Sequence, residues 1–238
     1  MDSTKQPKIL IIAPHSKCDN TNEERHCDRR AKVMAEKLEL LAKNAKYDVN
    51  LILSDNLRSV HDYNRKEAFD TPWRQRVRDY IESNRESPII IYETHSYPPK
   101  GTEFADGSQM ALLAIDEYYD GTKKMHDYLI NDAGINVHKA INRTRINNLM
   151  IDTTKYPNIN HHYLLEFNED PDILSTDDSS YAAGKVFLAS LFPKCMYFCR
   201  SYYLVIILAI LVIYLFVAGA FQFNSFIKLL LPVGYKTD

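Results

Sequence analysis

The sequence lacks a strong charge of either sign, and it lacks repeats. Its 29 lysines and arginines nearly balance 31 aspartates and glutamates, which gives a formal net charge of -2 at pH 7. A protein that binds the nucleic-acid backbone needs an excess of basic residues, so the composition gives no electrostatic case for nucleic acid as a partner. The sequence also contains no internal repeat and no low-complexity tract, which argues against a repeat architecture.

Cysteine is scarce, and the amino terminus offers no secretory signal. Four cysteines in 238 residues fit a reducing compartment better than a disulfide framework. The apolar stretch KILIIAP at residues 8–14 is too short for the hydrophobic region of a signal peptide, and charged residues follow it. We therefore expect the folded part of the chain to be cytosolic, or to face the interior of whatever a membrane encloses.

Charge is missing altogether from one long segment near the carboxyl end. No charged residue occurs between Ser201 and Ile227, and this segment supplies the roughly 20 apolar residues that cross the hydrocarbon core of a bilayer. We therefore predict a single transmembrane helix at residues 201–223, after a short joint at 194–200 and before a tail at 224–238. This carboxyl-terminal anchor would place the protein in a membrane. A buried core helix or hairpin is the alternative.

Residues 1–193 alternate between short apolar runs and longer stretches of helical period. The runs are rich in Ile, Leu and Val without alternation, which is typical of strands buried on both faces. This pattern predicts one α/β domain with a mostly parallel central sheet and helices on both faces. Strands are expected at 8–13, 48–54, 88–94, 110–116 and 163–168, and helices at 28–42, 72–83, 123–131 and 179–191.

Polar residues follow the apolar runs where the strands should end. In an open α/β sheet, ligands bind beyond the carboxyl ends of the strands. The first run ends in PHS with His15, and the third ends in ETHS with His95. Two histidines and one carboxylate can hold a zinc ion and leave a position open for water. Asp28 is the first candidate for that carboxylate because it opens the helix after the first strand, and Glu24 is the second.

The second run leads into SDNLRSVHDYNR at residues 54–65, which crowds many polar groups together. Among them are Arg58, Asp62, Asn64 and Arg65. Each motif has an alternative interpretation without a function. A histidine at a strand end is commonly a hydrogen-bonded structural residue, and residues 54–65 could be a charged surface loop.

Taken in order, these motifs resemble the N-formylglutamate amidohydrolase family, which belongs with the zinc carboxypeptidase-like hydrolases. The shared pieces are PHS, an acidic residue at the start of the next helix, R-x-x-x-D-x-N-R at residues 58–65, THS and a late LEFN that contains Glu166. They cover about residues 8 to 190, and R-x-x-x-D-x-N-R is the specific one. The resemblance implies a phosphorylase/hydrolase-like α/β fold, one zinc ion and hydrolysis of an amide bond.

The resemblance also implies a role for each residue. Zinc would be bound by His15, His95 and Asp28, with Glu24 as the alternative to Asp28. Glu166 would be the general base. The substrate would be bound by Arg58, Asn64 and Arg65, and Asp62 would orient one of the two arginines. A carboxylate can take a proton from the attacking water and pass it to the leaving amine. One arginine can bind a carboxylate while a second steadies an oxyanion. The expected substrate is therefore an N-acyl amino acid or peptide that bears a carboxylate.

The chain departs from the family pattern at Lys17, where the family usually has glycine after PHS. This leaves a second hypothesis, in which an inactive domain of the same fold serves as a membrane-anchored binding or structural protein. Cys18 and Cys27 flank the acidic ligand and could bind zinc as thiolates instead. His161 and His162 stand just before the last expected strand and are expected to be structural, far from the site.

Overall fold

The computed structural model describes residues 5–19, 27–98, 107–142 and 147–191 of the chain. The chain divides after Leu191, and every helix and strand of the described residues lies before that point. In chain order these elements are β1 (Lys8–Ala13), α1 (Ala31–Asn44), β2 (Val49–Leu53), a 3-10 turn (Lys66–Ala68), α2 (Pro72–Ser83), β3 (Ile89–Tyr97), β4 (Met110–Ala114), a second 3-10 turn (Asp116–Tyr118), α3 (Tyr119–Asn131), β5 (Val137–Asn142), α4 (Asn148–Thr153), β6 (Ile159–Asn168) and α5 (Thr176–Leu191).

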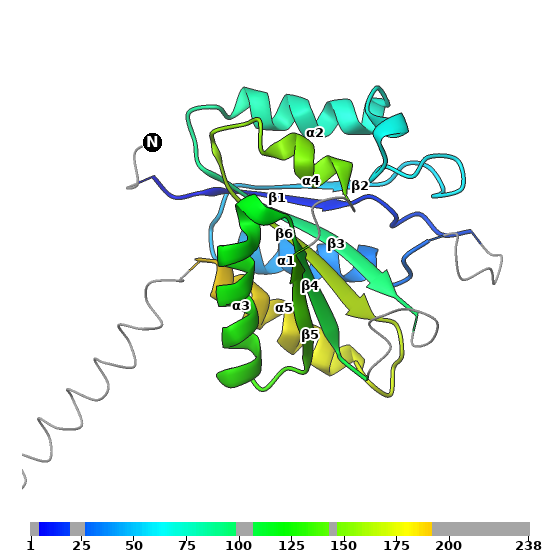
Figure 1. Ribbon diagram of the computed structural model, residues 1–238, viewed down its shortest axis with the longest axis vertical. Coiled ribbons are helices and arrows are strands. Elements are labelled where there is room, and N and C mark those ends of the chain that lie inside the picture. Colours follow the sequence, from blue (N-terminus) through cyan, green and yellow to red (C-terminus); the bar gives the residue numbers. More distant parts are fainter. Residues whose placement is uncertain (1–4, 20–26, 99–106, 143–146, 192–238) are drawn as a thin grey trace, which may run out of the picture. The chain divides into compact units, whose positions relative to one another are not determined.

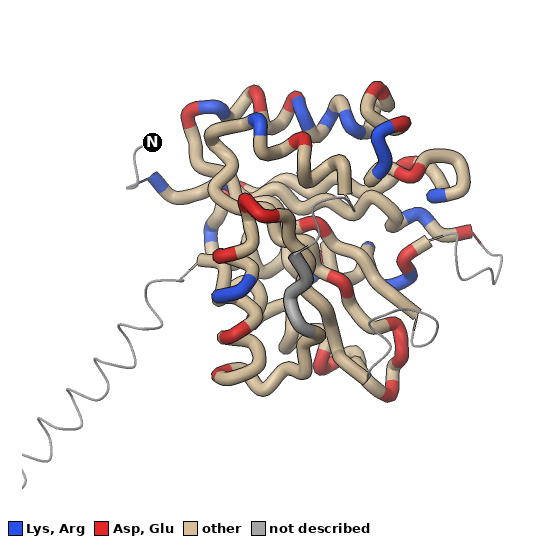
Figure 2. Tube along the Cα trace, viewed as in Figure 1, with Lys and Arg blue, Asp and Glu red and all other residues tan. Residues whose placement is uncertain are grey.

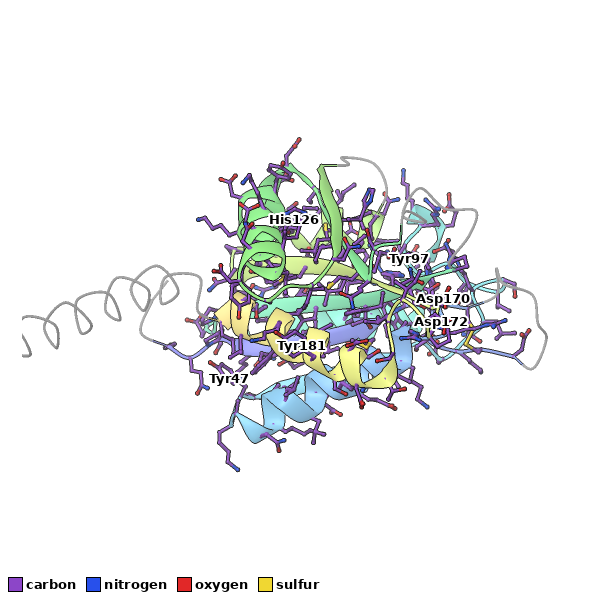
Figure 3. All side chains as sticks on the ribbon, turned by 90° about the horizontal axis from the view of Figure 1, so that it is seen from below. Tyr47, Tyr97, His126, Asp170, Asp172 and Tyr181 are labelled. Atoms are coloured by element: carbon purple, nitrogen blue, oxygen red, sulfur yellow. A yellow bond between two sulfur atoms is a disulfide. The ribbon has the colours of Figure 1, made fainter. Side chains whose placement is uncertain are left out.

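The strands form one mixed sheet in the order β2-β1-β3-β6-β4-β5. The first four of these strands are parallel to one another. β4 pairs with β6 in the antiparallel sense, and β5 runs parallel to β4. The carboxyl ends of β1, β2, β3 and β6 therefore meet at one edge of the sheet, together with the amino end of β4. Figure 3 shows Tyr97 at the end of β3 and Asp170 just beyond β6 at the same end of the domain.

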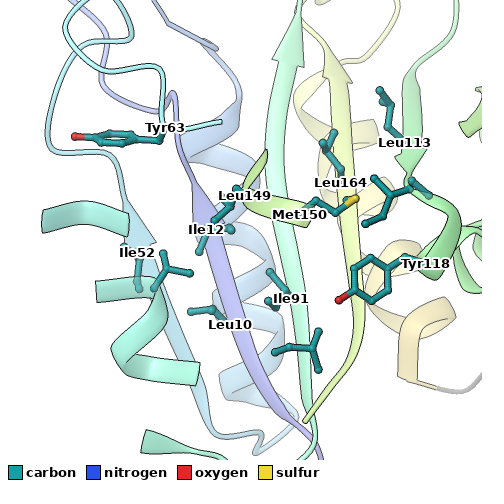
Figure 4. Packing of buried hydrophobic residues seen from close by; sticks show 14 of the residues in the cluster. Leu10, Ile12, Ile52, Tyr63, Ile91, Leu113, Tyr118, Leu149, Met150 and Leu164 are labelled. Carbon is teal, nitrogen blue, oxygen red and sulfur yellow. The ribbon is translucent and has the colours of Figure 1, made fainter. Parts of the chain in front are cut away.

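Helices cover both faces of the sheet (Figure 1). On one face α5 contacts both α1 and α3. On the other face α2 and α4 pack over a buried cluster that joins their apolar residues to alternate residues of the strands (Figure 4). Its members include Leu10, Ile12, Ile91, Leu164, Trp73, Val77, Leu149 and Met150. Burial on both faces explains why the central strands read as continuous apolar runs.

The local sequence explains why α2 begins where it was predicted to begin. The Thr71 side chain accepts a hydrogen bond from Arg74 N, and Pro72 occupies the first helical position, where its missing N–H costs nothing. Trp73 is fully buried, and its ring nitrogen donates to Leu53 O at 2.8 Å. This bond ties the helix to the end of β2 and so fixes the ends of the loop between them.

The outer helices carry both acidic and basic residues, as Figure 2 shows for α2. This agrees with the near balance of charge in the sequence. All five predicted strands form, but the sequence pattern missed β5 and α4, and β6 begins at Ile159 rather than at residue 163.

One part of the predicted fold class needs correction. In the part of the chain that the structure describes, no helix is both long and apolar enough to cross a membrane. The span predicted at 201–223, its joint at 194–200 and its tail at 224–238 lie outside the described residues. The predictions of an anchored fold and of a membrane location are therefore corrected. What the structure describes is a mixed α/β sheet with helices on both faces.

Candidate active site

The edge where the parallel strands end brings together three residues selected from the sequence as metal ligands. His15 follows β1, Asp28 precedes α1, and His95 lies near the end of β3. Asp28 Oδ2 lies 3.2 Å from His15 Nδ1 and 2.6 Å from His95 Nδ1. The two imidazole centroids are 4.9 Å apart, and the three potential ligand atoms all lie within 4.8 Å of one another. All three side chains are buried.

This set of donors fits a divalent cation such as zinc. Zinc takes imidazole nitrogen and carboxylate oxygen at about 2.0–2.2 Å, which places tetrahedral ligands roughly 3.3 Å from one another. The separation of 3.2 Å between His15 and Asp28 is already close to that value. The shorter separation between His95 and Asp28 would have to widen by a fraction of an ångström.

A second carboxylate stands behind each histidine. His15 Nε2 lies 2.9 Å from Asp62 Oδ1, and His95 Nε2 lies 2.8 Å from Glu93 Oε1. An ionised carboxylate only accepts hydrogen bonds, so each Nε2 donates to it. Histidines that bind metals commonly have such a partner, which fixes the ring and leaves the other nitrogen for the metal.

The electrostatics of the cluster favour ionised carboxylates. Burial raises the pKa of Asp28, but hydrogen bonds with His15 and His95 outweigh burial and hold that pKa well below its usual range. In the same way burial raises the pKa of Asp62, while the hydrogen bond with His15 and the charges of His15 and Arg58 bring it below its usual range. Carboxylates must be ionised to bind a metal ion, so the site is prepared for one.

Backbone and side-chain contacts hold the segment before α1 in place. Asp28 N donates to His15 O at 3.0 Å. The next amide, Arg29 N, donates to Glu169 Oε1 at 2.8 Å, and Ser96 Oγ donates to the same oxygen at 2.6 Å. Glu169 follows β6, so this carboxylate joins the start of α1 to the ends of β3 and β6.

Cys18 and Cys27 form a disulfide between the segments that carry His15 and Asp28. This finding corrects two expectations. The cysteines at these positions are not free thiols, and their sulfur atoms are bonded to each other rather than available as thiolate ligands. Glu24, the alternative carboxylate, lies outside the described residues.

The loop after β2 supplies the polar residues expected to grip a substrate, and Asp62 stands at its centre. Asp62 Oδ1 accepts from His15 Nε2 and, at 3.2 Å, from Asn64 N. Asp62 Oδ2 lies 3.6 Å from Arg58 Nε and 3.3 Å from Arg65 Nε. In the structure Asp62 therefore contacts both arginines and a candidate ligand, whereas the sequence suggested contact with one arginine.

Residues of α2 fasten this loop. Tyr63 stacks on Trp73 with ring centroids 4.6 Å apart, and Arg74 Nη1 donates to Tyr63 O at 2.9 Å. Asn64, which is 9% exposed, places Nδ2 3.1 Å from His95 Nε2. Its Oδ1 atom is buried and has no hydrogen-bond partner among the residues that the structure describes. Asn64 therefore lies directly beside a candidate ligand.

Glu166 lies on β6 directly beside His95. The two residues are paired in the register of the parallel strands β3 and β6, so their side chains leave the same face of the sheet on strands about 4.8 Å apart. Burial raises the pKa of Glu166 to about 7, against the lowering effect of His95, while Asp28 adds to the rise. A carboxyl group with this pKa can accept and release a proton near neutral pH.

Solved structures with this arrangement of helices and strands are known. The gene product Atu2144 from Agrobacterium tumefaciens superposes with a TM-score of 0.57 at 15% identity, over 82% of this chain and 92% of that chain. The N-formylglutamate amidohydrolase from Ralstonia eutropha superposes with a TM-score of 0.52 at 11% identity, over 79% and 93%. The chain shares its fold with an amide hydrolase. No family model and no curated protein matches the sequence.

Three buried residues behind His95 were not selected from the sequence. Glu93 Oε1 accepts from His95 Nε2, and Glu93 Oε2 lies 2.8 Å from His162 Nε2. Asn147 Nδ2 donates to Glu93 Oε1 as well. His162, expected to be remote from the site, is thus joined through Glu93 to a candidate ligand. A glutamate inside the apolar run of β3 was the available signal, because such a residue is rarely buried without partners.

Lys17 stands where the family usually has glycine, and its contacts lie on the neighbouring loop. Its backbone N–H donates to Ser54 Oγ at 2.8 Å, and its Nζ donates to Asp55 O at 2.7 Å. The lysine therefore joins the loop after β1 to the loop after β2, which carries Asp62.

Proposed function

We propose that the chain is a metal-dependent amide hydrolase that acts on an N-acyl amino acid or peptide bearing a carboxylate. The observation that carries the proposal is the convergence of His15 Nδ1 and His95 Nδ1 on Asp28 Oδ2. Glu166 lies beside His95 on the next strand and supplies a carboxyl group for proton transfer. The fold shared with an amidohydrolase supports the same reaction class.

His15, Asp28 and His95 would hold a zinc ion, which when bound supplies a Lewis acid for the amide carbonyl and lowers the pKa of water. Glu166 accepts a proton from water as the water oxygen attacks the carbonyl carbon. The same carboxyl group then gives the proton to the nitrogen of the leaving amine, and the C–N bond breaks. The second proton of the water also ends on the amine, so the products near neutral pH are a carboxylate and a protonated amine.

Arg58 and Arg65 recognise the substrate in this proposal. Their side chains are 36% and 52% exposed, so their guanidinium groups can meet a ligand from solvent while Asp62 orients both. An arginine binds a carboxylate through two parallel hydrogen bonds, and a second cation near the reacting carbonyl stabilises the developing negative charge. Asn64, in the same loop, adds a side-chain amide beside His95 to this recognition surface.

The test compares the zinc-loaded full chain with its Glu166→Gln variant. N-formyl-L-glutamate and a set of N-acylated dipeptides serve as substrates, and an amine-reactive fluorophore measures the released amine. Glutamine keeps the shape of the side chain but cannot accept the proton, so we expect kcat to fall by about 10²- to 10⁴-fold at unchanged zinc content. Glu86 is exposed before β3, and Glu86→Gln is the matched control with unchanged kcat.

Three results would count against this proposal. A Glu166→Gln variant as active as the wild type would remove Glu166 from the reaction. A folded wild-type chain that takes up no zinc would remove the metal. Zinc uptake without hydrolysis of any substrate would favour the second hypothesis, in which the domain binds a ligand without catalysis.

A further inference from the structure

A carboxylate with no exposed surface lies behind the candidate metal centre. Glu93 is 0% exposed in the interior of β3, and it leaves the same face of the sheet as His95 two residues further on. A buried carboxylate is retained only where charges and hydrogen bonds replace water. Glu93 has three such partners, because His95 and Asn147 donate to Oε1 and His162 donates to Oε2.

Both ring nitrogens of His162 have a partner. Nε2 faces the carboxylate of Glu93, which only accepts, so Nε2 donates to it. Nδ1 lies 3.0 Å from Thr153 Oγ1, which also lies 2.7 Å from Met150 O. His162 is fully buried, so these two contacts fix its ring against Glu93.

Glu93 in turn fixes the ring of His95. Oε1 accepts the proton on His95 Nε2, and on the other side of the ring Nδ1 faces Asp28 Oδ2 at 2.6 Å. The ring orientation that turns Nδ1 toward the candidate metal position therefore depends on Glu93.

The short helix α4 ties this chain of contacts to the rest of the domain. Asn147 caps the helix, and its Oδ1 accepts from Leu149 N at 2.8 Å and Met150 N at 3.2 Å. The amide nitrogen of Asn147 is thereby aimed at Glu93. Thr153, at the end of the same helix, contacts His162 Nδ1 through its hydroxyl group. Both ends of α4 therefore hold the Glu93–His162 pair.

We propose that His162 is a positioning residue of the metal centre, which holds Glu93 by a hydrogen bond and, through Glu93, holds His95. Glu93 contacts the candidate ligand directly, and His162 keeps the carboxylate of Glu93 in place. The inference rests on the proposed function in one respect, namely that a cation binds at His15, Asp28 and His95. The role is one of orientation, since His162 touches neither the cation nor the substrate.

The affinity of the full chain for zinc tests the proposal, measured by competition with a chromophoric chelator. Glutamine at position 162 can still donate one N–H, but it lacks the rigid ring that contacts Glu93 and Thr153 at once. We expect His162→Gln to raise the Kd for zinc about tenfold and Glu93→Gln to raise it by up to about 100-fold, the range found for residues that support metal ligands. His161→Gln is the matched control, because its side chain alternates to the other face of β6, and it should keep the wild-type Kd.

A double variant separates positioning from general damage to the fold. Because His162 acts through Glu93, His162→Gln should add no further loss in the Glu93→Gln background. The visible absorption of the cobalt(II)-loaded His162→Gln chain should also differ from that of the wild type, because these bands report the placement of ligands around the metal. Asn147→Ser keeps a capping oxygen for α4 but removes the donor to Glu93, and it should also weaken zinc binding. If His162→Gln does not fold, Asn147→Ser tests the proposal in its place.

An unchanged Kd for zinc in His162→Gln, or a loss that persists in full in the Glu93→Gln background, would overturn the proposal. A measurement without metal distinguishes this failure from failure of the proposed function. In crystals of the metal-free His162→Gln chain, the carboxylate of Glu93 and the ring of His95 should be displaced from their wild-type positions. Unchanged positions would overturn the inference whether or not zinc binds, whereas a wild-type chain that binds no zinc would overturn the proposed function.

Discussion

Glu166 is predicted to give hydrolysis its dependence on pH. Desolvation of its carboxyl group raises its pKa to about 7. A general base acts only when ionised, so kcat/KM should be high above that pKa and fall as the pH drops through it. A bound divalent cation stabilises the ionised form and moves this fall to lower pH.

The pH profile of kcat/KM between about pH 5 and 9 checks this expectation. The fall on the acid side should disappear in the residual activity of Glu166→Gln. A wild-type profile that is flat, or that rises toward acid pH, would contradict the role of Glu166.

The candidate metal ligands could be chosen from the sequence, whereas Glu93 and His162, which hold His95 in place, could not. His15 and His95 end apolar runs, and parallel strands bring such ends to one edge of the sheet. The contact between Glu93 and His162 joins residues 69 positions apart and depends on β6 lying next to β3. Periodicity gives no information about strand order, so His162 was interpreted as lying outside the strand and away from the site.

The disulfide between Cys18 and Cys27 closes a short loop between two candidate ligands. Its cysteines are 9 residues apart, and for a loop of this size the chain-entropy account gives roughly 2.7 kcal/mol of stabilisation. We expect the Cys18→Ser/Cys27→Ser chain to lose about 2–3 kcal/mol of unfolding free energy. It should also bind zinc more weakly, because Asp28 is then less restrained near His15.

Urea denaturation with and without zinc measures both effects of the disulfide. The wild-type chain under reducing conditions should behave like the double variant. A double variant with the wild-type midpoint and the wild-type Kd for zinc would show that the disulfide does not support the site.

Gly121 allows α3 to approach β6 closely. A Cβ atom at this position would lie 2.0 Å from His161 Cε1, and that ring is itself packed between Tyr118 and Tyr163, with centroids 5.5 and 4.0 Å away. We expect Gly121→Ala to lower the unfolding free energy by about 1–3 kcal/mol, the usual cost of overpacking.

Gly184 offers a matched comparison, because it also lies in a helix but a Cβ atom there would meet nothing within 4 Å. Gly184→Ala should raise the unfolding free energy by about 0.5–1 kcal/mol through the higher helix propensity of alanine. Urea denaturation measures both variants. Equal effects of the two substitutions would contradict the close approach of α3 to β6.

The elements that the sequence pattern missed are short or mixed in composition. α4 spans only six residues, too few for a helical period to show. β5 has the sequence VHKAIN and lies at the edge of the sheet, where burial on both faces is not required. The long central strands and α2 were predictable because continuous apolar runs and a capped helix start are local signals.

The site exists only in the folded domain. Its candidate ligands and general base come from the loop after β1, the start of α1, β3 and β6, and the arginines come from the loop after β2. The sequence predicted a mostly parallel sheet, but not that β4 and β5 run against the other strands. This reversal brings the amino end of β4 beside Glu166, since Ala111 pairs with Glu166 in the sheet.

Anomalous diffraction at the zinc edge, from crystals of the zinc-loaded chain, tests the metal centre most directly. We expect one strong peak at about 2.0–2.2 Å from His15 Nδ1, His95 Nδ1 and an oxygen of Asp28, with Glu93 and Asp62 still behind the two rings. A zinc ion bound elsewhere, or no zinc in a folded chain, would contradict the account.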